Sequence, residues 1–88
     1  MPYRLRISKE VQHEITGLPG NIRQRVRRVI ADLVCDPRPP AAKPMDDDLA
    51  DYYRIRIDVY RIIYTIDEDR VLVDIIRVAR RTPRTYTN

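Results

Sequence analysis

Residues 52–67, YYRIRIDVYRIIYTID, predict a β-hairpin. Apolar side chains occupy every second position on both sides of a two-residue break, Asp58-Val59, and arginines lie between them at positions 54, 56 and 61. Side chains in a strand alternate between its two faces, and two such runs separated by two residues are typical of a hairpin. The facing pairs are then Tyr53 with Tyr64, Ile55 with Ile62, Arg56 with Arg61, and Ile57 with Tyr60. The apolar partners therefore lie on one face of the hairpin and the arginines on the other.

The basic face of this hairpin carries Arg54, Arg56 and Arg61. Arg56 and Arg61 are directly opposite like charges, which disfavours the sheet by some tenths of a kcal/mol and up to about 1 kcal/mol per pair. An anion between the two guanidinium groups would remove this penalty. The pattern therefore predicts a binding site for a multiply charged anion.

The apolar spacing before the hairpin predicts one strand and two helices. Residues 3–7 alternate apolar and basic side chains, as in a short strand. Ser8 can cap a helix that ends near Gly17, and residues 22–33 repeat apolar side chains with helical spacing. The two helices should form an antiparallel pair. Residues 36–51 hold four of the seven prolines, so we expect a surface connection there.

We expect residues 71–79 to form the last strand. If Ile66 faces Val71, then Val73 joins the core face. The predicted order is β-α-α-β-β-β in one domain that spans residues 1–88. The expected fold class is α+β, with an N-terminal helical hairpin packed on one face of a small antiparallel sheet and the arginines on the other face.

The balance of charge favours a polyanionic partner. The chain carries 17 Lys and Arg against 13 Asp and Glu, a net charge of +4, and nearly all of its bases are arginine. The planar guanidinium group suits phosphate better than the ammonium group of lysine. Four arginines also lie in the acid-free last twelve residues, namely Arg77, Arg80, Arg81 and Arg84. We therefore expect RNA or DNA as the partner, although a high arginine content can also reflect genomic composition.

Several other function classes are disfavoured. One cysteine and one histidine cannot form a zinc site, so neither a metal nor a cofactor is expected. We expect Cys35 to be a packed thiol at the end of an apolar helix and His13 to be a partly exposed helix residue. No apolar run reaches the roughly 18 residues of a membrane span, and the first ten residues lack the apolar core of a secretory signal. The default expectation is a cytoplasmic protein without a membrane partner.

A fourth arginine is expected to reach the basic face from the end of the last strand. Strict alternation from Ile76, the expected neighbour of Arg61, would place Arg80 there. The strand ends near this point, so alternation leaves the choice between Arg80 and Arg81 open. Four cations around one phosphate are what a metal-free ribonuclease needs, because its transition state gains negative charge at phosphorus.

RNA also supplies its own nucleophile, since the 2′-OH is tethered beside the phosphate and no metal or enzyme nucleophile is required. A base must accept the proton of the 2′-OH, and an acid must protonate the 5′ leaving oxygen. Tyr86 is the titratable candidate near the cations, because adjacent guanidinium groups favour a phenolate. Alternatively, Tyr86 packs on the sheet as a terminal aromatic residue.

These motifs resemble the RelE/ParE toxin superfamily, and specifically the RelE-like messenger-RNA interferases of type II toxin–antitoxin pairs. The resemblance extends over nearly the whole chain through MPYRLRIS, Leu18-Pro19, Lys43-Pro44, YRIRxxxYRIIYxID, and IIRVARR with a Tyr near the end. It implies the RelE-like microbial-RNase fold and an endoribonuclease that cuts messenger RNA in the ribosomal A site by 2′-OH attack. It also implies a cognate antitoxin protein, and operator DNA bound through the antitoxin complex.

The resemblance assigns catalytic roles to five residues. They are Arg54 and Arg56 at two basic strand positions, Arg61 as a phosphate-binding arginine, Arg81 after the last strand, and Tyr86 as the catalytic tyrosine. An arginine is a poor proton donor, so the general acid is left open. Further RNA contacts are expected from Lys43, Arg77, Arg80 and Arg84.

Two other functions stay open at this point. A ParE-like member would poison DNA gyrase through a protein–protein contact, although such members lack the RNase residues that Arg61, Arg81 and Tyr86 match. A decayed toxin would only bind its antitoxin, with the complex on operator DNA. Intact messenger RNA in growth-arrested cells would favour the first of these, and absence of toxicity would favour the second.

Overall fold

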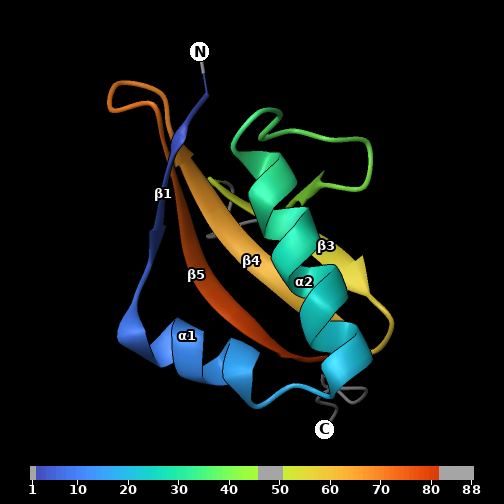
Figure 1. Cartoon of the computed structure of the whole chain (residues 1–88). Coiled ribbons are helices and arrows are strands. Elements are labelled where there is room, and N and C mark those ends of the chain that lie inside the picture. The colour runs from blue at the N-terminus through green and yellow to red at the C-terminus, as the bar shows by residue number, and fades with distance from the viewer. Residues whose placement is uncertain (1, 46–50, 82–88) are drawn as a thin grey trace, which may run out of the picture.

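The computed structural model describes residues 2–45 and 51–81, which form two helices and a five-stranded sheet. The helices are α1 (Lys9–Thr16) and α2 (Gly20–Leu33), and the strands are β1 (Arg4–Ile7), β2 (Lys43–Pro44), β3 (Tyr52–Ile57), β4 (Tyr60–Asp67) and β5 (Leu72–Arg80). The strand order is β1-β5-β4-β3-β2, in which β1 runs parallel to β5 and the other neighbours are antiparallel. Figure 1 shows α2 running diagonally over the sheet and α1 lying across one end of it.

The predicted α+β class is confirmed, and the two-residue β2 is an additional edge strand within the expected connection. The hydroxyl of Ser8 caps α1 by accepting a hydrogen bond of 3.2 Å from the N–H of Val11. Both helices bury their apolar stripes against the same side of the sheet, where the core contains Val11, Ile15, Val26, Ile30, Leu33, Ile55, Ile62 and Val73. Within the described ranges, the helices leave the other sheet face uncovered.

The β3–β4 hairpin has the predicted register, with Tyr53 opposite Tyr64, Ile55 opposite Ile62, Arg56 opposite Arg61, and Ile57 opposite Tyr60. In its turn Asp58 has a positive φ of 59°, whereas Val59 does not. A type I′ turn needs positive φ at both central positions, and a β-branched residue resists that conformation. Aspartate tolerates the left-handed region, so in this turn only Asp58 adopts the left-handed conformation and Val59 does not.

The predicted facing of Ile66 and Val71 is wrong, because Ile66 lies opposite Val73. The chain uses residues 68–71 to turn from β4 into β5. Val71 has a φ of 52° and is exposed at the end of this turn. A β-branched residue in the left-handed region does not continue a strand, so the pairing of β5 starts one residue later, at Leu72.

A β-bulge interrupts the pairing of β4 with β5. The register changes between Ile63 and Tyr64, and Ile76 is left without a partner on β4. An extra residue in one strand reverses the alternation of every side chain beyond it. Val78 and Ile75 are therefore both buried under the helices although they are three residues apart.

Tyr64 is fully buried at the centre of the core. Its hydroxyl donates a hydrogen bond of 2.7 Å to the carbonyl of Pro37, and its ring stacks on Tyr53 with the ring centroids 5.7 Å apart. Burial raises the pKa of Tyr64 to about 12. This side chain therefore connects the segment after α2 to the middle of the sheet.

The prediction of a packed thiol at Cys35 is wrong. α2 ends at Leu33, and Cys35 is exposed in the turn that follows. Pro37, four residues after the end of α2, is the next buried residue. His13 is exposed on α1, in line with its interpretation as a helix surface residue.

Tyr64 predicts a loss of stability at alkaline pH. Because its pKa is higher in the folded chain than in the unfolded chain, it stabilises the fold below about pH 10, and this contribution is lost as the pH rises toward 12. From about pH 9 to about pH 12, the wild type is expected to lose about 2 kcal/mol more unfolding free energy than Tyr64→Phe, which cannot ionise. Denaturant unfolding at several pH values measures this difference. Parallel stability curves for the two proteins would contradict the role of Tyr64.

Candidate functional site

Arginines gather on the sheet face that the helices leave uncovered. Arg54 and Arg56 project from β3 and Arg61 projects from β4, because residues two apart in a strand share a face and so do directly facing partners. Arg81 follows the end of β5 and lies close enough to Arg56 for its charge to help lower the pKa of the Arg56 guanidinium group. These four residues are called the arginine cluster below.

The main chain holds Arg81 beside the β3–β4 turn. Its backbone N–H donates a hydrogen bond of 2.6 Å to the carbonyl of Val59. Arg80 instead lies opposite Tyr60, which belongs to the partly buried, core-facing side of the hairpin. Arg81, and not Arg80, therefore completes the cluster.

Strict alternation predicts the wrong neighbour for Arg61. It therefore also predicts the wrong sheet face for each side chain at the end of β5. Arg61 lies opposite Ala79 and not opposite Ile76. The turn after β4 shifts the register, and the bulge then reverses the alternation. The expectation that alternation puts Arg80 on the basic face is therefore wrong, and the position that the family resemblance assigns to Arg81 lies beside the other cations.

Among the described residues, the arginine cluster is a concentration of positive charge that no ion pair neutralises. The charges of Arg54 and Arg81, followed by partial desolvation and the charge of Arg61, lower the pKa of the Arg56 guanidinium group. Within residues 2–45 and 51–81, no carboxylate forms an ion pair with any member of the cluster. The ion pairs there are Arg6 with Asp74, Arg38 with Glu68, Arg70 with Asp67, and Arg77 with Glu14. A polyanion would supply the missing negative charge.

The other predicted site residues do not all join the cluster. Lys43 on β2 lies opposite Arg54, so it extends the basic face to the sheet edge. Arg77 is turned to α1, where its Nε donates a hydrogen bond of 2.9 Å to Glu14. Arg84 and Tyr86 lie outside the described residues.

Tyr52 belongs to the same face, although sequence reasoning did not assign it to the site. It lies opposite Thr65, two residues before Arg54, and is half-buried. An aromatic ring at the margin of a cationic face is suited to stacking on a nucleic-acid base. The alternation along β3 is the signal that could have identified it.

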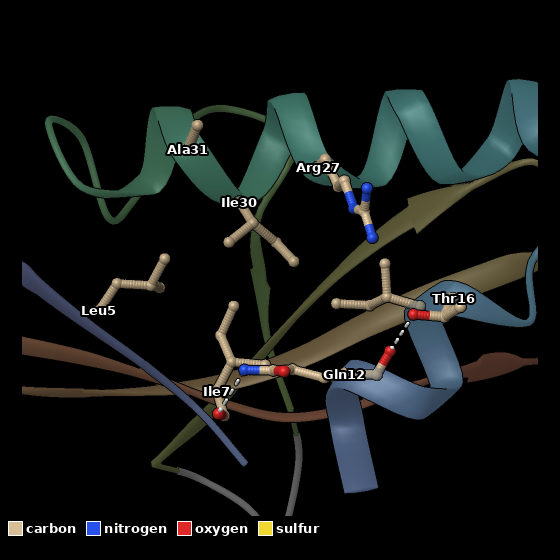
Figure 2. Close-up of a pocket in the computed structure, with 8 residues that line it drawn as sticks. Leu5, Ile7, Gln12, Thr16, Arg27, Ile30 and Ala31 are labelled. Atoms are coloured by element: carbon tan, nitrogen blue, oxygen red, sulfur yellow. Dashed lines mark hydrogen bonds between the residues drawn. The ribbon is translucent and has the colours of Figure 1, made fainter. Parts of the chain in front are cut away.

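A groove of about 340 Å³ opens elsewhere on the molecule, between β1, α1 and α2, and is lined by Leu5, Ile7, Gln12, Ile15, Thr16, Arg27, Ile30 and Ala31 (Figure 2). Two of its polar groups are used locally. The Gln12 amide donates to the carbonyl of Ile7 at 3.4 Å, and the Thr16 hydroxyl donates to the carbonyl of Gln12 at 2.9 Å. The lining is largely apolar and contains no carboxylate or thiol, so the arginine cluster is the better candidate for chemistry.

Two further properties of the described part of the chain bear on function. In those ranges, no group of three or more His, Cys, Asp or Glu side chains could hold a metal ion. No helix there is long and apolar enough to cross a membrane.

Comparison with known proteins gives one family and a consistent set of relatives. The family model for the ParE toxin of the type II toxin–antitoxin system parDE matches residues 5–83. The Toxin RelE of Mycobacterium tuberculosis is 32% identical over 82 residues, which cover 92% of this chain and 84% of the relative. A chain of the toxin–antitoxin complex RelBE2 from M. tuberculosis has a TM-score of 0.78 and 30% identity, and the match covers 92% of this chain and 100% of that chain. The isolated E. coli RelE toxin has the same fold, with a TM-score of 0.77, 23% identity, and coverage of 93% of this chain and 87% of that chain.

Proposed function

This chain belongs to the ParE toxin family of type II toxin–antitoxin systems and is RelE-like, and from this membership we propose that it is a ribosome-dependent endoribonuclease that cleaves messenger RNA. The observation that carries the proposal is the arginine cluster, in which four guanidinium groups share an uncovered sheet face without a paired carboxylate in the described residues. Such an arrangement costs the fold some repulsion. A phosphate that gains negative charge during a reaction would offset this repulsion, and the guanidinium groups would in turn stabilise its transition state.

The proposed reaction starts with attack of an RNA 2′-OH on the adjacent phosphorus. A 2′-O–P bond forms while the P–O5′ bond breaks, which leaves a 2′,3′-cyclic phosphate and a 5′-OH. A base takes the proton of the 2′-OH, and an acid gives a proton to the departing 5′ oxygen. The negative charge that builds on the non-bridging oxygens meets guanidinium groups that are already in position.

Each member of the site has a distinct role in this proposal. Arg61 and Arg81 bind the scissile phosphate and stabilise the charge that develops on it, because they flank Arg56 from the neighbouring strand and from the end of β5. Arg54 and Arg56 stabilise the developing charge and do not transfer a proton, since a guanidinium group remains charged at neutral pH. Tyr86, outside the described residues, is proposed as the base.

Two macromolecular partners follow from the proposal. The ribosome would align the messenger, so cleavage of free RNA should be slow. A cognate antitoxin is supported by the M. tuberculosis relative, which was solved as a toxin–antitoxin complex. An acidic, amphipathic segment would fit this chain, because it could neutralise the arginine cluster and cover the apolar groove. The complex would then bind operator DNA in the cytoplasm.

A second candidate is inhibition of DNA gyrase. The observation that favours it is that the matching family model describes the ParE toxin. A gyrase inhibitor acts through protein contacts and leaves messenger RNA intact, so it gives the arginine cluster no chemical task. A third outcome, an inactive chain that only binds its antitoxin, would give no growth arrest.

Induced expression followed by primer extension on a translated messenger tests the proposal. We expect cuts within codons that appear after induction and disappear when translation is blocked, because the ribosome aligns the substrate. Growth arrest with intact messenger and DNA damage would replace the proposal with the gyrase function. Absence of arrest would replace it with the inactive binding protein.

A further inference from the structure

The edge of β5 changes its partner halfway along the strand. β1 pairs only with Leu72–Ile75, and its last residue is Ile7. Beyond Ile75, α1 takes the place of β1 beside β5, as Figure 1 shows at the lower end of the strand. The backbone groups on this part of the edge therefore need a partner other than a strand.

Glu14 of α1 supplies that partner. One carboxylate oxygen, Oε1, accepts a hydrogen bond of 2.8 Å from the N–H of Val78, and the other, Oε2, accepts one of 2.9 Å from Nε of Arg77. The Glu14 side chain is only 28% exposed, whereas that of Arg77 is 62% exposed. The better shielded of the two contacts is thus the bond to the backbone of β5, which is also a strong, charge-assisted hydrogen bond.

These two contacts lie at the bulge. Ile76 is the residue without a partner on β4, and Arg77 and Val78 are the two residues directly after it. The bulge reverses the alternation of the strand and thereby brings Arg81, three residues beyond Val78, to the face of the arginine cluster. Without it, continued alternation from Ile75 would turn Arg80 to that face.

We propose that Glu14 is a positioning residue, whose carboxylate holds the β5 bulge and so places Arg81 beside Arg56 and Arg61. Burial of Val78, which is 2% exposed, favours the same register. Removal of Glu14 therefore loosens the end of β5 and displaces Arg81, without unfolding the sheet. The part of this inference that concerns catalysis rests on the proposed function, and the part that concerns the strand does not.

Amide hydrogen exchange in Glu14→Ala, Glu14→Gln and Arg77→Ala tests the structural part. Glu14→Ala should raise the exchange rates of the Val78 and Arg81 amides by about tenfold or more, because a charge-assisted hydrogen bond is lost and the end of the strand opens. The amide of Val73, farther back in β5, serves as the control and should keep its rate. Glu14→Gln retains an acceptor oxygen and Arg77→Ala retains the whole carboxylate, so both should stay within about threefold of the wild type.

Cleavage on programmed ribosomes tests the catalytic part. Glu14→Ala should lower kcat by about tenfold with little change in KM, and Glu14→Gln should restore most of the loss, because a misplaced Arg81 weakens transition-state stabilisation more than RNA binding. Unchanged exchange at Val78 and Arg81 in Glu14→Ala would overturn the inference, as would a Glu14→Gln variant as defective as Glu14→Ala. If the wild type cleaves no RNA, the proposed function fails, and the exchange rates still decide the role of Glu14 in the strand.

Discussion

Replacement of Arg61 with alanine is expected to lower messenger cleavage by about a hundredfold to a thousandfold, which is the usual cost of removing one preorganised donor from a developing oxyanion. Arg61 is central to the cluster, because it faces Arg56 directly and lies beside the end of β5. The measurement is the rate of cleavage on programmed ribosomes, with growth arrest after induction as the cellular readout. Arg25→Ala is the matched control, since it removes the same charge from an exposed position on α2.

The same substitution should not weaken the fold. Arg56 and Arg61 are opposed like charges, so removal of the Arg61 charge should raise the unfolding free energy by some tenths of a kcal/mol, up to about 1 kcal/mol. Denaturant unfolding measures this change. A large loss of stability would show that Arg61 supports the sheet, and unchanged cleavage by a stable Arg61→Ala protein would remove it from the proposed mechanism.

Alanine at Arg81 is expected to lower cleavage by about a hundredfold or more, whereas alanine at the neighbouring Arg80 should cost no more than severalfold. The two changes remove identical side chains from consecutive positions. The two side chains lie on opposite faces of the sheet, because Arg81 lies near Arg56 while Arg80 lies opposite Tyr60, which faces the core.

Single-turnover cleavage of the two variants on programmed ribosomes separates these positions. Double replacement should resemble Arg81→Ala alone. If Arg80→Ala were the more damaging of the two, the strand would end in the unbulged register when RNA is bound. Equal and small losses at both positions would mean that only the total charge of this region matters, as in nonspecific RNA binding.

The hairpin could be predicted from sequence because its information is local. Alternation with a period of two and a two-residue turn are sufficient to set Arg56 against Arg61 and to put the facing pairs of Tyr53 with Tyr64 and Ile55 with Ile62 on the core side. The helix boundaries were similarly accessible, since Ser8 caps α1 through its own side chain and the apolar spacing of α2 is regular. These elements depend on residues close together in the chain.

Cys35 and Val71 show where local patterns fail. Cys35 closely follows the apolar pattern of residues 22–33 and is therefore predicted to pack, but α2 ends at Leu33 and leaves Cys35 exposed. Val71 looks like the first residue of a strand, yet it occupies the left-handed region at the end of a turn. Both errors concern the residue at which an element begins or ends, and neighbouring segments decide that point more strongly than intrinsic preference does.

The sequence by itself determined the two faces of the sheet, the order of the elements other than β2, and three of the four arginines in the cluster. The tertiary structure decided the fourth. Whether Arg80 or Arg81 reaches the cluster depends on the β4–β5 register and on the bulge at Ile76. Glu14 of α1 contacts the two residues directly after the bulge, Arg77 and Val78, which lie 63 and 64 positions further along the chain. Alternation in a single strand contains no information about an extra residue, because a bulge is stabilised by partners on other elements.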